Sequence, residues 1–164
     1  MASLLPKDVM HLAERVIAEN AAAGRKVAVA ESCTGGLVCG ALTEVPGSSS
    51  VLDRGFVTYS NESKQEMLDV PEDLIETFGA VSPAVAWAMA QGALKHSAAD
   101  VAVAISGIAG PDGGSEMKPV GTVVFACAFR GEEEVNAEQR LLDGKTRADV
   151  RRQATVVALE LLLP

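Results

Sequence analysis

A serine lies between a short apolar segment and a glycine pair, at a position where its hydroxyl could act as a nucleophile. The stretch reads Ala30-Glu31-Ser32-Cys33-Thr34-Gly35-Gly36, and the surrounding hydrophobic pattern predicts a buried strand followed by a helix. A helix N-terminus presents unpaired N–H groups, which can bind a phosphate or an oxyanion. Because Ser and Thr are also common helix caps, the sequence leaves two roles open for Ser32: capping and nucleophilic attack on a carbonyl.

A serine nucleophile needs a base, and Lys64 is the candidate. It falls inside a helix that Asn61 is expected to cap, near the N-terminus, where the helix macrodipole opposes a cation. No acid occupies its i±3 or i±4 positions, so both features favour the neutral amine. His11 and His96 fall on segments with amphipathic spacing, and neither has an evident claim to be the base.

Tyr59 is the only tyrosine in the chain, and it precedes Lys64 at the end of an expected strand. A phenol at that position could relay or orient a proton. The sequence therefore predicts a Ser32–Tyr59–Lys64 set, a variant of the serine triad in which a lysine is the base. A solvated surface lysine is the alternative for Lys64.

Cys33 is a rival nucleophile, since a helix N-terminus lowers the pKa of a thiol, but no histidine stands out as its base. The three cysteines are Cys33, Cys39 and Cys127, and they form no Cys-x-x-Cys pair. This pattern argues against a disulfide framework and against a structural zinc site. We therefore expect no metal, no cofactor and a reducing, cytoplasmic setting.

Two further segments have the composition of anion-binding sites. The first is the glycine-rich loop Ser106-Gly107-Ile108-Ala109-Gly110-Pro111-Asp112-Gly113-Gly114. It leads into a strand, whereas the dinucleotide fingerprint and the Walker loop lead into a helix. Its N–H groups could still form an anion-binding nest, and a flexible turn is the alternative. The second is Gly144-Lys145-Thr146-Arg147, which suits either a phosphate or ordinary capping at the start of the last helix.

Composition limits the classes of partner. The chain has 164 residues, of which 48% are hydrophobic and 22% charged, with a net charge of −8, as is typical of a globular protein. This acidic balance repels nucleic acid and anionic lipid surfaces, so we expect neither as a partner. The first residues lack the apolar core of a signal peptide, and no apolar run approaches the roughly 20 residues of a membrane span. An anionic small molecule could still bind in a pocket whose local charge is positive.

Helices and strands alternate along the chain. Apolar spacing and capping residues predict helices over 6–23, 34–45, 61–68, 71–79 and 82–97, and a last helix after Thr146. Strands are expected at 26–30, within 51–59, and at 101–106, 119–130 and 133–142, with a tight turn at Arg130-Gly131. This order predicts an α/β fold, a three-layer α/β/α sandwich around a mixed sheet. Residues 1–164 are expected to form a single domain.

Six linked segments resemble the C-terminal domain family of CinA proteins, the nicotinamide mononucleotide deamidases. Three of them are Ala30-Glu31-Ser32-Cys33-Thr34-Gly35-Gly36, Val45-Pro46-Gly47-Ser48-Ser49 and Thr58-Tyr59-Ser60-Asn61-Glu62-Ser63-Lys64. The others are Gly79-Ala80-Val81-Ser82, Gly107-Ile108-Ala109-Gly110-Pro111 and Lys118-Pro119-Val120-Gly121-Thr122-Val123. The resemblance covers nearly the whole chain. In one departure, Ser106 stands where many relatives have threonine, and both residues carry a hydroxyl.

The resemblance implies hydrolysis of the carboxamide of nicotinamide mononucleotide to nicotinate mononucleotide and ammonia, as a step in pyridine nucleotide recycling. It implies that Ser32 is the nucleophile and that Tyr59 and Lys64 complete the catalytic set. Backbone N–H groups near residues 33–35 would then stabilise the oxyanion. Residues 33–36, residues 106–110 of the glycine-rich loop, Thr146 and Arg147 would contact the substrate, and the loop with Thr146 and Arg147 would hold the ribose phosphate.

The resemblance also suggests a homodimer or a larger homo-oligomer. It further suggests the stand-alone form of the family, without the additional domain, similar to molybdopterin-binding proteins, that relatives often carry. Two other functions stay open from the sequence. One is a non-catalytic, nucleotide-binding regulatory module, and the other is a thiol enzyme that acts through Cys33.

Overall fold

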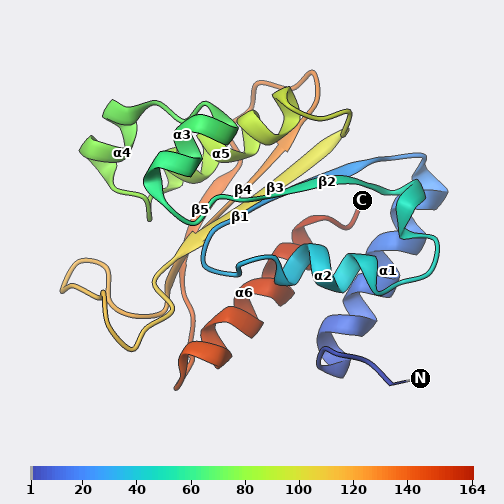
Figure 1. Ribbon diagram of the computed structural model, residues 1–164, viewed down its shortest axis with the longest axis horizontal. Helices are drawn as coiled ribbons and strands as arrows, with labels where there is room; N and C mark the ends of the chain where they lie inside the picture. The colour runs from blue at the N-terminus through green and yellow to red at the C-terminus, as the bar shows by residue number, and fades with distance from the viewer. Residues whose placement is uncertain (1) are drawn as a thin grey trace.

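A five-stranded mixed sheet forms the centre of the molecule (Figure 1). The computed structural model describes residues 2–164. The strands are β1 (Val27–Glu31), β2 (Leu52–Val57), β3 (Val101–Gly107), β4 (Thr122–Phe129) and β5 (Ala137–Leu141), in the spatial order β2-β1-β3-β4-β5. β1 is parallel to β2 and β3, whereas β4 and β5 are antiparallel to their neighbours. The carboxyl ends of the three parallel strands therefore meet at one end of the sheet.

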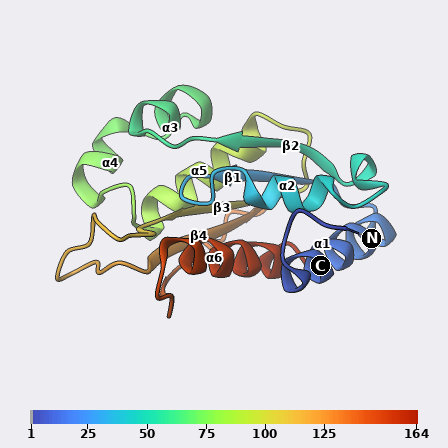
Figure 2. The same ribbon diagram turned by 60° about the horizontal axis from the view of Figure 1, so that its bottom comes forward.

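Helices cover both faces of the sheet (Figure 2). One face carries α1 (Lys7–Ala23), α2 (Leu37–Thr43) and α6 (Arg147–Leu161), and the other carries α3 (Asn61–Leu68), α4 (Glu72–Phe78) and α5 (Pro83–Lys95). A short 3-10 helix, η1 (Ser48–Ser50), links α2 to β2. The predicted three-layer α/β/α sandwich with a mixed sheet is confirmed. Within residues 2–164, no helix is both long enough and apolar enough to cross a membrane.

The two faces of the sheet carry side chains of different size. Valine, isoleucine, phenylalanine and cysteine face α1, α2 and α6, whereas mostly alanine faces α5. Successive strand residues point to opposite faces, so the alternation in Val101-Ala102-Val103-Ala104-Ile105 produces this difference. Small side chains let α5 lie close to the sheet. Gly92 of α5 lets α3 approach in turn, because a β-carbon there would lie 2.0 Å from the carbonyl oxygen of Leu68.

The start of α2 differs from the prediction. The helix begins at Leu37 and not at Thr34. Gly35 and Gly36 have φ angles of +59° and +104°, which lie outside the right-handed helical region and which glycine adopts readily. Residues 32–36 therefore form a separate turn between β1 and α2.

Hydroxyl caps begin two of the helices near the site. The cap of α3 is Ser60 and not Asn61, because the Ser60 hydroxyl accepts from the N–H of Ser63 at 3.1 Å. Thr146 caps α6 as predicted, since its hydroxyl accepts from the N–H of Asp149 at 3.1 Å. Both caps satisfy an N–H that the first helical turn leaves unpaired.

The β4–β5 hairpin has shorter strands and a longer connection than predicted. β4 begins at Thr122 and β5 at Ala137, so residues 130–136 form the connection. The predicted turn at Arg130-Gly131 is present, since the N–H of Glu132 donates to the carbonyl of Phe129 at 3.1 Å, but it does not lead directly into β5. Residues 132–134 are three consecutive glutamates, and all are exposed. Like charges are better solvated than paired side by side in a strand ladder.

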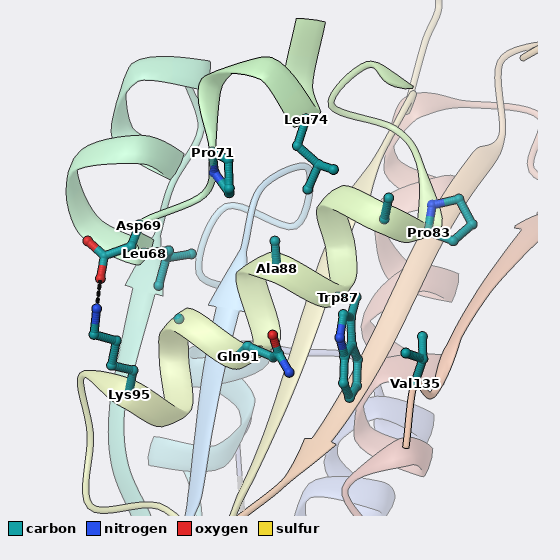
Figure 3. A pocket seen from close by; sticks show the side chains of 12 residues that line it. Leu68, Asp69, Pro71, Leu74, Pro83, Trp87, Ala88, Gln91, Lys95 and Val135 are labelled. Atoms are coloured by element: carbon teal, nitrogen blue, oxygen red, sulfur yellow. Dashed lines mark hydrogen bonds and ion pairs between the residues drawn. The ribbon is translucent and has the colours of Figure 1, made fainter. Parts of the chain in front are cut away.

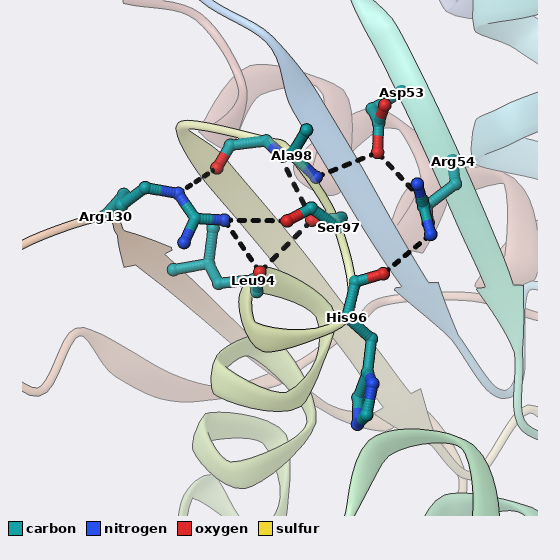
Figure 4. Close-up of polar contacts among 8 residues, drawn as sticks. Asp53, Arg54, Leu94, His96, Ser97, Ala98 and Arg130 are labelled. Atoms are coloured by element: carbon teal, nitrogen blue, oxygen red, sulfur yellow. Dashed lines mark hydrogen bonds and ion pairs between the residues drawn. The ribbon is translucent and has the colours of Figure 1, made fainter.

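At the amino ends of the parallel strands, Arg130 ties the end of α5 to the sheet (Figure 4). Its Nε donates to the carbonyl of Ala99 at 2.7 Å. Its Nη2 donates to the carbonyls of Leu94 at 2.7 Å and Ser97 at 3.0 Å. Because the last carbonyls of a helix lack partners within the helix, this arginine completes the end of α5.

Asp53 and Arg54 of β2 extend the same network (Figure 4). Arg54 donates from Nη1 to the carbonyl of His96 at 2.8 Å and from Nε to Asp53 at 2.8 Å. Asp53 also accepts from the N–H of Ala98 at 3.1 Å. This N–H, together with Arg54, holds the pKa of Asp53 below its ordinary value. The network at this end of the sheet joins α5 to β2, β3 and β4.

Candidate active site

A cavity of about 270 Å³ opens at the carboxyl ends of β1 and β3, the end at which ligands bind in open α/β sheets. The turn after β1, the start of α3, the connection between α4 and α5, the glycine-rich loop and the first residue of α6 form its wall. The lining residues are Ser32, Cys33, Tyr59, Asn61, Lys64, Ala80, Val81, Ser106, Gly107, Ile108, Ala109, Gly110, Asp112, Gly113 and Arg147. Segments far apart in the sequence thus share one site.

Ser32 and Lys64 are in direct contact. Nζ of Lys64 lies 3.1 Å from Oγ of Ser32. Ser32 is 7% exposed and Lys64 only 1% exposed. The N–H of Ser32 donates to the carbonyl of Ile105 at 2.9 Å, which extends the β1–β3 pairing to the serine. The structure therefore brings together the two residues that the sequence suggested as nucleophile and base.

The surroundings of Lys64 suit a neutral amine. Burial lowers its pKa from the ordinary lysine value, and the nearby Cys33 and Glu62 oppose this effect only in part. Nζ also lies 2.9 Å from the carbonyl oxygen of Thr58 and 3.2 Å from that of Tyr59. A neutral amine has two N–H donors and one lone pair. The two carbonyls can take both donors, which leaves the lone pair for the Ser32 hydroxyl proton.

Tyr59 contacts Lys64 through its main chain and Arg147 through its side chain. Its hydroxyl accepts from Nη2 of Arg147 at 3.0 Å, and Nη1 of the same arginine donates to the carbonyl of Gly110 at 2.7 Å. Tyr59 is 62% exposed. In this arrangement the phenol orients Arg147, and a proton relay from the phenol to Lys64 is not among the contacts of the described residues.

The turn after β1 leaves one donor free at the cavity. The N–H of Gly35 donates to the carbonyl of Ser32 at 3.0 Å. Among residues 2–164, the N–H groups of Cys33 and Thr34 have no carbonyl, carboxylate or hydroxyl acceptor. Of these two residues, Cys33 lines the cavity. The N–H of Cys33 is therefore one of the unpaired donors among the residues that line the cavity, and it follows Ser32 directly.

Three of the predicted contact residues in this turn lie outside the cavity wall. Thr34 is fully buried, and its hydroxyl donates to the carboxylate of Glu31 at 2.7 Å. Gly35 and Gly36 shape the turn through their positive φ angles. Thr146, also predicted to contact the substrate, lies outside the wall as well, and its hydroxyl caps α6.

Burial makes the thiol of Cys33 a poor nucleophile. It raises the pKa of Cys33 to about 11, although Arg151 and Lys64 act in the opposite direction. A thiol with this pKa is protonated at neutral pH, and only the thiolate is reactive. In the part of the chain that the structure describes, neither His11 nor His96 lines the cavity.

The glycine-rich loop forms one wall of the cavity. All five predicted residues, 106–110, line it. Figure 1 shows the loop, in yellow to orange, extending past the end of the sheet. A side chain would not fit at Gly107, because a β-carbon there would lie 2.8 Å from Cγ2 of Val123. Across residues 2–164, no group of three or more His, Cys, Asp or Glu side chains could hold a metal ion.

Known proteins are similar to this chain in sequence and in fold. Residues 9–164 match the CinA C-terminal domain. The chain belongs to this family. The nicotinamide-nucleotide amidohydrolase PncC of Escherichia coli strain K12 is 52% identical over 94% of this chain and 93% of its own length. The crystal structure of competence/damage inducible protein CihA from Agrobacterium tumefaciens has a TM-score of 0.94 and 48% identity, over 98% of this chain and 97% of that one.

Other relatives of this CinA domain are longer proteins. A putative competence-damage inducible protein of Symbiobacterium thermophilum is 53% identical over 90% of this chain, which spans 35% of that protein. A CinA-like protein of Akkermansia muciniphila is 49% identical over 99% of this chain, which spans 37% of that protein. The CinA domain therefore occurs in proteins of different length.

Sequence reasoning missed Glu31, which holds the turn that contains Ser32. Its buried carboxylate accepts from the Thr34 hydroxyl at 2.7 Å and from the N–H groups of Val38 at 3.0 Å and Cys39 at 3.2 Å. A charged residue at the end of an apolar strand, directly before Ser32, was the signal that could have identified it.

Arg151 was also missed. Its Nε donates to the carbonyl of Cys33 at 3.0 Å, and its Nη2 lies 3.4 Å from the carbonyl of Thr34. Residues four apart lie on the same face of a helix, so the position of Arg147 at the site implied that Arg151 would follow. The two arginines together bring positive charge to the site in a protein with a net charge of −8.

A larger hollow of about 750 Å³ lies along α5 (Figure 3). Its lining is mostly apolar and includes Leu74, Pro83 and Trp87. Its charged residues, Asp69 and Lys95, pair with each other at 2.8 Å. A catalytic site needs a positioned nucleophile and base, so the chemistry favours the smaller cavity at Ser32.

Proposed function

We propose that this CinA domain hydrolyses the carboxamide of nicotinamide mononucleotide to nicotinate mononucleotide and ammonia, with Ser32 as the nucleophile. The observation that carries this proposal is the 3.1 Å contact between Oγ of Ser32 and Nζ of Lys64, a buried lysine with a lowered pKa. The name of the relative that is 52% identical, nicotinamide-nucleotide amidohydrolase, supports the substrate. The reaction would serve in pyridine nucleotide recycling.

The reaction proceeds in two halves. The neutral amine of Lys64 takes the proton of Ser32 as Oγ attacks the carboxamide carbon, and the N–H of Cys33 stabilises the oxyanion. The protonated Lys64 then gives its proton to the departing nitrogen, which leaves as ammonia, and an ester with Ser32 remains. Water, deprotonated by Lys64, attacks this ester and releases the carboxylate. The net change consumes one water per amide.

Tyr59 and Arg147 complete the proposed site. The carbonyl of Tyr59 holds the amine of Lys64, and its hydroxyl fixes the guanidinium of Arg147. Two of the five guanidinium N–H donors have partners here, so the others can bind the ribose phosphate. The glycine-rich loop, residues 106–110, adjoins Arg147 through the carbonyl of Gly110 and binds the remainder of the nucleotide.

Ammonia release tests the proposal. Nicotinamide mononucleotide, its riboside and free nicotinamide share the amide, so each is assayed with the wild-type protein and with Ser32→Ala. We expect the mononucleotide to be the best substrate and the variant to be inactive. Near-wild-type turnover by Ser32→Ala would show that the mechanism is wrong. Mononucleotide binding without ammonia release would make the domain a nucleotide-binding regulatory module.

We propose further that residues 1–164 act as one domain, without metal or cofactor, in the cytoplasm. We also propose a homodimer or a larger homo-oligomer, and no role for nucleic acid or membrane, in keeping with the net charge of −8. Light scattering measures the oligomeric state. Activity that survives extensive dialysis against a chelator is the expected result for an enzyme without a metal, and loss of activity restored by a divalent cation would contradict it.

A further inference from the structure

Glu31 is a buried charged residue that the proposed mechanism does not use. It ends β1, directly precedes Ser32, and is 0% exposed. Its carboxylate accepts from three neutral donors: the Thr34 hydroxyl and the N–H groups of Val38 and Cys39. A buried charge is unfavourable unless hydrogen bonds compensate for its lost hydration. A residue of this kind next to a nucleophile therefore calls for a specific reason.

Capping alone does not provide that reason. Hydroxyl groups of Ser60, Ser82 and Thr146 cap α3, α5 and α6 in the same protein. A hydroxyl would therefore be sufficient for α2. The carboxylate of Glu31 does more, because its two oxygens bind the first turn of α2 and the side chain of Thr34 at the same time. Thr34 lies inside the turn that begins with Ser32, so the turn is fixed to the helix that follows it.

The main chain of Glu31 reaches the other half of the catalytic pair. Its carbonyl accepts from the N–H of Thr58 at 2.8 Å. The carbonyl of Thr58 in turn lies 2.9 Å from Nζ of Lys64. One residue thus connects the serine turn, through its side chain, with the segment that holds the lysine, through its backbone.

We infer that Glu31 is a positioning residue for the proposed reaction: its carboxylate holds the serine turn so that Oγ of Ser32 stays within hydrogen-bond distance of Lys64. It touches neither the hydroxyl nor the amine. The assay with the mononucleotide rests on the proposed function, whereas the contacts of Glu31 do not depend on which substrate the protein takes. Catalytic groups must be held closely, since a misplacement of about 1 Å can lower a rate about 100-fold.

The charge of Glu31 also favours serine over the neighbouring thiols. After the larger effect of burial, its carboxylate raises the pKa of both Cys33 and Cys39. Burial is what keeps both thiols protonated at neutral pH, and the carboxylate of Glu31 acts in the same direction. Ser32, beside a neutral amine, then has no competing thiolate in the turn.

Two variants test the inference. Glu31→Gln keeps the length of the side chain but replaces one acceptor oxygen with an NH2 donor, which faces the donors of α2. Thr34→Val keeps the shape of Thr34 but removes its hydrogen bond to Glu31. We expect kcat for the mononucleotide to fall about 100-fold in Glu31→Gln and about tenfold in Thr34→Val. KM should change little in both variants. The melting temperature should fall in Glu31→Gln, because its NH2 group leaves buried donors unpaired, so kcat is measured on the folded fraction; the exposed Glu66→Gln is the matched control.

A second readout does not depend on the natural substrate. Diisopropyl fluorophosphate forms an Oγ–phosphorus bond with an activated serine as fluoride leaves and the proton passes to Lys64. Mass spectrometry gives the labelling rate of Ser32 in each variant. If the wild-type protein is labelled but releases no ammonia, the proposed function fails, and the labelling rates still report on Glu31.

Wild-type kcat and labelling rates in folded Glu31→Gln would overturn the inference. A lower melting temperature with unchanged kcat in the folded fraction would also overturn it, because Glu31 would then serve folding alone. If Glu31→Gln does not fold, Thr34→Val decides the question. Slower labelling in a stable Thr34→Val protein supports positioning, and wild-type labelling rejects it.

Discussion

Each end of the central sheet places a basic side chain among main-chain carbonyls. At the amino end, Arg130 donates to three carbonyls at the end of α5 and before β3 (Figure 4). At the carboxyl end, Lys64 lies against two carbonyls and the hydroxyl of Ser32. A guanidinium stays charged in proteins, whereas a buried amine loses its proton readily. The two basic side chains therefore have similar contacts, but only the lysine can take up and release a proton.

The third partner distinguishes the two ends. All three partners of Arg130 are carbonyls, which can only accept, so the arginine has no proton to exchange and its role is structural. One partner of Lys64 is a hydroxyl, which can give up a proton to a neutral amine. Burial favours that neutral form, because the pKa of Lys64 lies below its ordinary value. A buried lysine against a serine hydroxyl is thus a better sign of catalysis than a cation among carbonyls.

The largest expected difference between the two ends of the sheet is in turnover. Ser32→Ala and Lys64→Met should each lower kcat for ammonia release by about 10⁴-fold or more, because the serine and its base act as one unit. Arg130→Met should leave kcat within about twofold of wild type once the protein is folded. Steady-state assays of the purified variants measure this, and a large loss of kcat in Arg130→Met would remove the distinction between the two ends.

Arg147 should affect binding more than chemistry. Arg147→Ala should raise KM for the mononucleotide about 10- to 100-fold, the value of one or two charge-assisted hydrogen bonds to a phosphate. KM for the riboside, which lacks the phosphate, should change much less. If the two substrates lose affinity equally, Arg147 does not bind the phosphate.

The lowered pKa of Lys64 predicts the pH dependence of the reaction. The base must be neutral to accept the proton of Ser32, so kcat/KM should rise about tenfold per pH unit below the pKa of Lys64 and level off above it. The midpoint should lie below 10.5, the ordinary lysine value. A pH–rate profile with a midpoint at 10.5 or higher would show that burial does not tune this lysine.

The two basic residues should have opposite effects on stability. Arg130→Met should lower the unfolding free energy by about 2 kcal/mol, since it removes charged hydrogen bonds to helix-end carbonyls. Lys64→Met should raise it by about 1 kcal/mol at pH 7, because a buried amine, which is unfavourable to transfer from water, gives way to an apolar side chain. Urea unfolding measures both. Reduced stability in Lys64→Met would mean that its hydrogen bonds outweigh its burial.

The lowered pKa of Lys64 also determines whether stability rises or falls with pH. The pKa of Lys64 is lower in the folded state than in the unfolded chain, so the unfolded chain binds more protons between the two values. The unfolding free energy should therefore rise with pH from the folded pKa up to about 10.5. This rise should be absent in Lys64→Met.

Replacement of Cys33 should have the smallest effect on turnover. Cys33→Ala should keep kcat within about threefold of wild type, because a thiol with a pKa of about 11 carries little thiolate at neutral pH. Activity should also resist brief alkylation at pH 7. Complete loss of turnover in Cys33→Ala, with the serine variant still active, would make this a thiol enzyme.

Patterns over a few residues determined the architecture. The short apolar runs of the strands, the helical spacing of apolar residues and the caps at Ser82 and Thr146 act between close neighbours. They were therefore readable from the sequence, and they predicted the α/β sandwich and its mixed sheet. The errors lay where glycine geometry or solvated charges overrode the pattern, at the start of α2 and in the β4–β5 connection.

Contacts between distant residues were decided by the tertiary structure alone. The sequence singled out Ser32, Tyr59 and Lys64, but packing across 32 residues brings the first to the last, and packing across 88 residues gives the hydroxyl of Tyr59 to Arg147. The same packing directs Thr34 into the interior, where it meets Glu31. Residue type and spacing set which groups can react, whereas the close approach of α3 and α6 to the end of the sheet sets which of them meet.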